Sequence, residues 1–128
     1  MAIRITVAPG ELIDKITILE IKFERISAPK KLENVKHELR VLRQEYATSV
    51  TATEELQDLT SRLKKANEAL WEIEDDIRDC ERGQNFGTKF IELARSVYKV
   101  NDQRAAVKRQ INELLNSDIF EEKSYAAY

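Results

Sequence analysis

Polar and aromatic side chains recur on one face of a helix that the sequence predicts over residues 52–82. They are Asn67, Trp71, Glu74 and Arg78, at steps of four, three and four, with Asp75 beside them. A second predicted helix, over residues 88–116, has a matching face beside its own apolar stripe, at Tyr98, Asn101, Ala105 and Lys108. If these two faces meet, or if both face the first predicted helix, they form a polar pocket with an aromatic wall. In that pocket Arg78, Arg104 and Lys108 could hold an anionic ligand.

The same residues also have a structural interpretation, which stays open beside the first one. A polar layer between helices can fix their register, and Trp71 could equally anchor a dimer contact. Arg104 falls in the apolar stripe of its own helix, in the layer of Ala66 and next to Asn67. Because a half-buried arginine needs an acceptor, the fold has to supply one, which the sequence alone does not identify.

Two pairs of carboxylates have the i, i+3 spacing at which one divalent cation can be shared. The pairs are Glu55 with Asp58 and Glu72 with Asp75. This pattern resembles the E-x-x-E/D…E-x-x-D motif of the all-α nucleoside-triphosphate pyrophosphohydrolases, which implies Mg²⁺ as a cofactor of a metal-dependent hydrolase. In that family the pairs lie on two helices, whereas here both fall on one predicted helix. We therefore expect a solvated acidic face, with no metal and no cofactor.

The overall composition argues against several other classes of protein. A net charge of −2 gives no basic excess for binding nucleic acid. The apolar runs are too short for a membrane span, and the first residues lack the apolar segment of a signal peptide. His37 and Cys80 are the only residues of their types, so a zinc site or a Cys/His pair is not expected. One unpaired cysteine fits the reducing cytoplasm, where we expect the protein to be located.

The helix over residues 52–82 is the element that must position the first polar face. Its apolar residues alternate at steps of three and four, the heptad pattern of a helix that packs along other helices. They are Leu56, Leu59, Leu63, Ala66, Leu70, Ile73, Ile77 and Cys80, called the seam below. We expect the seam to be buried against other helices.

Three further helices and two flanking segments complete the predicted fold. The helices cover about 11–26, 29–49 and 88–116, and the last runs antiparallel to the seam helix after a glycine-containing loop. Alternation of Ile3, Ile5 and Val7 with polar residues predicts a short strand or an extended N-terminal arm over residues 2–7, and residues 117–128 form a tail. The chain is therefore predicted as one domain over residues 1–128, an all-α, elongated, antiparallel and coiled-coil-like bundle of four helices.

Charge differs between the predicted helices. Residues 53–82 contain ten acidic and five basic side chains, whereas residues 29–50 and 88–117 contain more basic than acidic ones. Opposite charges at the rims of helices favour their pairing, although a chain so rich in charge can show such sorting by chance. If the sorting is meaningful, the acidic helix lies between the two basic ones.

Three blocks of the sequence are specific enough to compare with known families. They are IRITVAPGELIDKITILEIKFERI at 3–26, ANEALWEIEDDIRDCE at 66–81 and FIELARSVYKVNDQRAAVKRQINELLNSDIFEEKSYA at 90–126. Together they resemble a family of short bacterial proteins known only as a domain of unknown function, and residues 67–78 also resemble a second helical family of unknown function. The resemblance implies that such proteins are encoded near glycosyltransferase and surface-polysaccharide genes, and it transfers no catalytic residue to this chain.

Apolar seams dominate this sequence over any catalytic arrangement, so we expect a non-catalytic protein of assembly or partner binding. Long two-sided helices and an unpaired strand favour a homodimer, and a protein partner is a further prediction. The resemblance adds an accessory role in surface-polysaccharide synthesis. The alternative is a binder of nucleotides or sugar nucleotides, or a metal-dependent hydrolase, that uses the polar pocket. Geometry separates the two, because a pocket requires its polar side chains to converge in one cavity.

Overall fold

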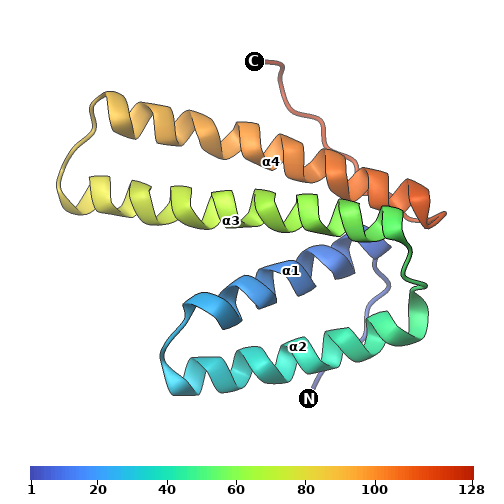
Figure 1. Ribbon diagram of the computed structural model, residues 1–128. Coiled ribbons are helices and arrows are strands. Elements are labelled where there is room, and N and C mark those ends of the chain that lie inside the picture. The colour runs from blue at the N-terminus through green and yellow to red at the C-terminus, as the bar shows by residue number, and fades with distance from the viewer.

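The computed structural model describes residues 1–128 and contains four helices. They are α1 (Pro9–Arg25), α2 (Pro29–Ser49), α3 (Glu54–Arg82) and α4 (Thr88–Leu114). Figure 1 shows them as two antiparallel hairpins, α1–α2 and α3–α4, with α1 lying between α2 and α3. The predicted all-α bundle is confirmed, and none of the four helices has the length and apolar character that crossing a bilayer requires.

Local sequence explains where these helices begin. Pro9 and Pro29 each occupy the first helical position, where a missing N–H costs nothing and the fixed φ suits a helix. α3 begins after Thr53, whose hydroxyl accepts a hydrogen bond of 3.1 Å from the backbone N–H of Leu56. Two of the three connections between helices, those that precede α2 and α3, therefore end at residues that favour a helix start.

α1 is the central helix of the molecule. It packs against each of the other three helices, whereas α2 packs against α1 alone. Eight of its 17 residues are buried, so it is covered on several sides. The acidic α3 therefore lies beside α4 and α1, and the prediction that it also lies beside the basic α2 is wrong.

Two apolar clusters form the core, one on each side of α1. The first joins α1 to the α3–α4 hairpin and consists of Ile13, Leu56, Leu59, Leu63, Val107 and Ile111. The second joins α1 to α2 and consists of Leu12, Ile16, Leu19, Val35 and Leu39. Because α1 belongs to both clusters, it connects the two hairpins.

The seam of α3 is unevenly buried. Leu56, Leu59, Leu63 and Cys80 are buried, but the four seam residues that lie between Leu63 and Cys80 are only half-buried. α1 ends at Arg25, whose guanidinium lies 3.7 Å from Glu68 and 3.4 Å from Glu72. Beyond that point α3 and α4 continue as a two-helix projection, which we call the arm (residues 73–98; Figure 1).

The two ends of the chain have no regular secondary structure. Residues 1–8 form no strand, and Ile3 and Ile5 are exposed, so the predicted strand is not formed in the single chain. The tail folds back along α4, where Arg109 lies 3.3 Å from Glu122 and the rings of Tyr98 and Tyr128 are 5.1 Å apart. The tail is therefore ordered against α4.

Candidate functional site

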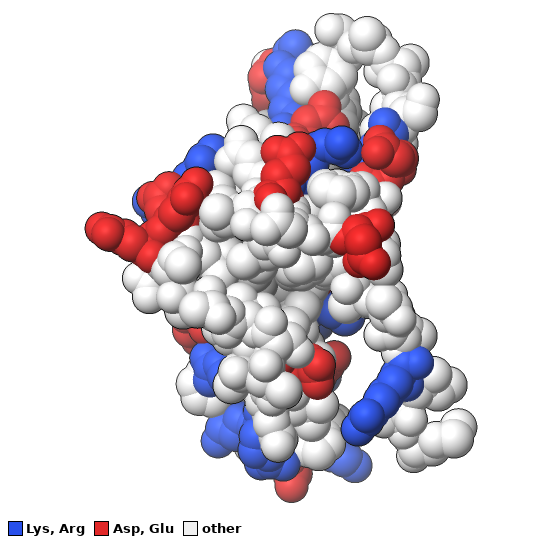
Figure 2. Space-filling view, turned by 90° about the vertical axis from the view of Figure 1, so that its right-hand side faces the viewer, with Lys and Arg blue, Asp and Glu red and all other residues white.

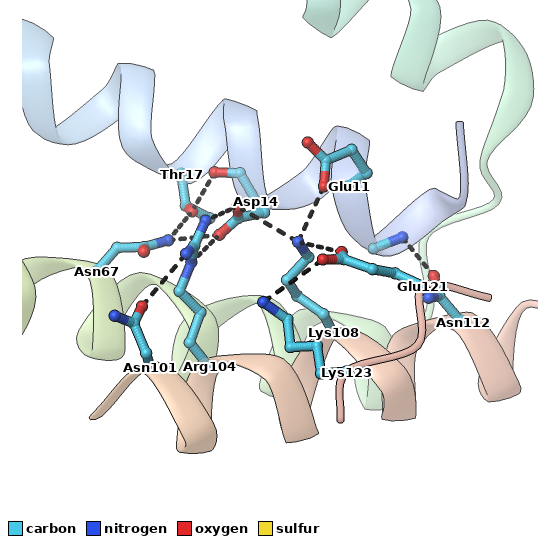
Figure 3. A network of polar contacts seen from close by, with 11 residues as sticks. Glu11, Asp14, Thr17, Asn67, Asn101, Arg104, Lys108, Asn112, Glu121 and Lys123 are labelled. Carbon is cyan, nitrogen blue, oxygen red and sulfur yellow. Dashed lines mark hydrogen bonds and ion pairs between the residues drawn. The ribbon is translucent and has the colours of Figure 1, made fainter. Parts of the chain in front are cut away.

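A buried carboxylate, Asp14, lies where α1 crosses α3 and α4 (Figure 3). Its side chain is 2% exposed. Arg104 of α4 donates from Nε to Oδ1 at 3.0 Å and from Nη2 to Oδ2. Asn67 of α3 donates from Nδ2 to the same Oδ1 at 2.9 Å. Asp14 is therefore the acceptor that Arg104 requires, and we call this meeting point of three helices the junction.

A second cation, Lys108, lies beside the same carboxylate. Its Nζ is 2.9 Å from Glu11, 3.9 Å from Asp14 and 3.4 Å from Glu121 in the tail. Burial lowers the pKa of Lys108, but the hydrogen bond to Glu11 and the surrounding acidic charges outweigh it and leave that pKa raised. The hydrogen bond from Arg104 to Asp14 likewise raises the pKa of that guanidinium. Both cations therefore keep their charge around neutral pH.

Gly10 allows α1 and α4 to approach closely at the same place. Its backbone N–H donates to Oδ1 of Asn112 at 2.7 Å, which satisfies one of the free N–H groups at the start of α1. A Cβ at this position would lie only 2.7 Å from the backbone carbonyl oxygen of Lys108. The junction is thus fixed by ion pairs at Asp14 and by backbone contact at Gly10.

Six of the eight residues predicted for a polar pocket line one cavity of about 400 Å³. They are Asn67, Trp71, Glu74, Asp75, Arg78 and Arg104, joined by the apolar Ile18, Ile21 and Leu70. The cavity lies at the base of the arm, and α1 forms part of its wall. Asn101 contacts Arg104 at 3.5 Å without lining the cavity, and Lys108 lines a separate cavity beneath the tail.

The charges around this cavity differ from those of the predicted anion site. Arg104 is neutralised by Asp14, and Arg78 is paired with Glu74 on its own helix. Lys108, the third predicted cation, points to Glu11 and the tail. All three predicted cations are therefore paired with carboxylates, and Asp75 adds an unpaired negative charge to the lining. The lining has no unpaired cation to offer to a phosphate.

The four carboxylates with the metal-binding spacing do not form a cluster. Glu55 and Asp58 are exposed near the start of α3, and Glu72 lies beside Arg25. No three side chains of the His, Cys, Asp or Glu types lie close enough together to hold a metal ion.

Comparison with known proteins places the chain in a family. A family model matches residues 1–128, the whole of the chain described above. The chain belongs to the family of unknown function DUF6165. No curated protein and no solved structure matches it. The resemblance to a family of unknown function is thus confirmed.

Several junction residues of this DUF6165 chain, Asp14 and Thr17 among them, are missing from the sequence-based predictions. Asp14 was overlooked because the apolar residues around it on α1 dominate the pattern. So was Thr17, whose hydroxyl accepts from Asn67 at 3.0 Å and donates to the carbonyl of Asp14 at 2.8 Å. A signal was present, since Gly10, Asp14, Thr17 and Ile21 recur at steps of four, three and four and all four are buried. They form a second line along α1.

Proposed function

We propose that this protein is a non-catalytic assembly protein that works as a homodimer joined through the arm. The observation that carries the proposal is the amount of uncovered surface. A compact monomer of 14.8 kDa exposes about 7,000 Å², whereas this chain exposes 9180 Å². The difference, roughly 2,000 Å², exceeds the ~800 Å² that each partner contributes to a stable interface of standard size.

Apolar side chains of the arm support its role as the interface. Phe86 and Ile91 are 47% and 53% exposed, and Tyr98 is exposed although Tyr128 lies against it. Ile73 and Ile77 are half-buried because the arm has only two helices to cover its seam. The arm thus exposes apolar groups of the kind that protein–protein contacts cover, although the N-terminal segment and the tail expose such groups as well.

Charge favours a second copy of this chain as the occupant. Lys30 and Lys31 of α2 are exposed and form no ion pair, and neither do Asp75, Asp76 and Glu81 in the arm. Figure 2, which faces the C-terminal end of α2, shows further Lys and Arg side chains at the lower edge of the molecule. Since α2 does not contact α3 within one chain, their complementary charges remain available between two chains.

The junction supports a structural role over a catalytic one. Both carboxylate oxygens of Asp14 already accept hydrogen bonds from Arg104 or Asn67. A carboxylate so occupied holds three helices together and has little capacity left to bind a ligand or a metal. A place in the cytoplasm and an accessory role in surface-polysaccharide synthesis are compatible with such a protein, and the second depends on the family resemblance alone.

Sedimentation equilibrium tests the dimer directly. We expect a species of twice the 14.8 kDa chain mass that Ile91→Glu converts to a monomer, because the new charge would be buried in the interface. Ile5→Glu is the matched control, since Ile5 is also an exposed isoleucine but lies outside the arm. A monomeric parent protein, or equal effects of the two substitutions, would disprove an interface at the arm.

A charge exchange tests which groups meet across the interface. Reversing Lys30 and Lys31 to Glu should weaken the dimer, and adding Asp75→Lys and Asp76→Lys should restore it. Rising salt should also weaken the parent dimer, as the reversal of Lys30 and Lys31 does, because salt screens exposed charges. If the fourfold variant is no tighter than the double variant, α2 and the arm do not meet in the dimer.

A further inference from the structure

The floor of the cavity beside Trp71 contains an unpaired acceptor. Asn67 is only 5% exposed, and both hydrogens of its amide are engaged by Asp14 and Thr17 at 2.9 Å and 3.0 Å. Its Oδ1 accepts no hydrogen bond from the protein. Every fully enclosed side-chain nitrogen or oxygen has a partner, so this oxygen retains some exposure, and the cavity that Asn67 lines is the open space beside this residue. A buried residue that turns a free carbonyl toward a cavity indicates a ligand with an N–H group.

A donor lies next to this acceptor. Arg104 Nε and Asn67 Nδ2 both bind Oδ1 of Asp14, so the guanidinium and the amide lie side by side (Figure 3). Three bonds, two to Asp14 and one to Asn101, leave part of the five-donor guanidinium free. Arg104 also lines the cavity. The floor therefore presents an N–H donor beside a carbonyl acceptor, the complement of an amide-like edge.

The walls of the cavity suit a flat ring. Trp71 is the only tryptophan of the chain, and it lines the cavity together with the aliphatic Ile18 and Ile21 of α1. An indole stacks well on planar heterocycles, because each ring presents an extended polarisable face. A volume of about 400 Å³ is in the range of small-molecule pockets.

The rim of the cavity selects against phosphate. Arg78 is paired with Glu74 on the same helix, and Arg104 is paired with Asp14, so the positive charge of each is already neutralised. Asp75 is unpaired at the rim, and Glu68 and Glu72 lie on the same helix beside Arg25. A phosphate group would meet a net negative field here, whereas an uncharged ligand would not.

We propose that this cavity binds a nucleobase, presented as the free base or the nucleoside and not as the nucleotide. Asn67 Oδ1 accepts from a base N–H, Arg104 donates to the adjacent base oxygen or ring nitrogen, and Trp71 stacks on the ring. All common bases carry such a donor beside an acceptor, so the floor selects the class of ligand and not one base. The floor of this site lies outside the arm, but its rim shares Asp75 with the proposed dimer interface, so the site adjoins that interface.

Trp71 provides the measurement, because it is the sole tryptophan. The parent protein is titrated with adenosine, guanosine, cytidine and uridine while indole fluorescence is followed at the red edge of its absorption. We expect saturable quenching by at least one nucleoside, and weaker quenching by its 5′-monophosphate. If no nucleoside quenches at millimolar concentration, or if the monophosphate binds more tightly, the proposal is wrong.

Calorimetry of three variants separates stacking from a general effect. Trp71→Leu keeps an apolar side chain but loses the aromatic face, and it should weaken binding about tenfold or more. Trp71→Phe should retain most of the affinity. Phe23→Leu, the matched control, alters an exposed aromatic that lines a different cavity, of about 470 Å³ between α1 and α2, and should leave binding unchanged. Equal affinities for the parent and Trp71→Leu would overturn the site even if a nucleoside binds elsewhere.

Discussion

α3 and α4 contribute to both the junction and the arm, yet the two regions are held together in different ways. In the junction the ion pairs join distant segments, as between Asp14 and Arg104 or between Glu11 and Lys108. In the arm they connect neighbours on one helix, such as Glu74 with Arg78 and Asp79 with Arg82. Only the first kind fixes one helix against another, and exposed pairs within one helix contribute little to stability.

The difference arises from what covers each half of the hairpin. α1 closes the groove between α3 and α4 at the junction, and the seam residues Leu56 and Leu63 are fully buried there. No third helix covers the arm, where Ile73 and Ile77 stay half-buried. A heptad seam therefore specifies that α3 packs on α4, but a third helix decides how much of it leaves water.

The largest expected effect comes from removing the carboxylate of the junction. Asp14→Ala leaves Arg104 and Lys108 partly buried without their shared counter-charge, which should lower the free energy of unfolding by about 3–5 kcal/mol. Asp75→Ala removes an exposed, unpaired carboxylate of the arm and should change it by less than about 0.5 kcal/mol. Urea denaturation followed by circular dichroism measures both.

The milder Asp14→Asn keeps this test decisive if Asp14→Ala does not fold. It retains an acceptor for Asn67 but loses the charge, so its cost should fall between those of the other two variants. Equal stabilities of Asp14→Asn and Asp75→Ala would contradict the distinction between junction and arm.

A smaller contrast is expected from truncating the seam in each half. Leu63→Ala empties a fully buried position and should cost about 2–5 kcal/mol, because the cavity cannot be filled by water or by relaxation. Ile77→Ala should cost roughly 1 kcal/mol in the monomer, since one side of this residue is already open. Denaturation at several protein concentrations refines the comparison, because a dimer that covers the arm would make only the Ile77→Ala cost rise with concentration. The same cost for both substitutions in dilute protein would mean that the arm is packed as fully as the junction.

The sequence predicts the helices well because their signals are local. The heptad seam defines α3, and the glycine-containing loop between residues 83 and 87 ends it. Arg104 could be recognised as needing an acceptor, because it interrupts an apolar stripe. These conclusions need only the spacing of residues along one helix.

The parts that could not be predicted depend on which helices meet. Asp14 lies 90 positions before Arg104, and no periodicity along one helix connects them. The same limit explains why α2 was expected beside α3: charge sorting indicates complementary partners but not whether they meet within one chain. The candidate cavity lies between these cases, since the polar face of α3 was visible in the sequence while the contribution of Ile18 and Ile21 from α1 was not.

The smallest expected effect concerns the tail, which Glu121 ties to Lys108 at the junction. The charge of Lys108 lowers the pKa of Glu121 below its usual value of about 4.3. Because the folded pKa is lowered, this contact stabilises the docked tail above the ordinary pKa and is lost as the pH falls through the folded value. The contribution is below about 1 kcal/mol, since Glu121 is half exposed.

NMR should therefore show the methyl signal of Ile119 moving toward its unfolded position on acidification, while that of Ile111 in the core stays fixed. Glu121→Gln should produce the same shift at neutral pH, and simultaneous movement of both methyl signals would mean that the tail and the junction open together.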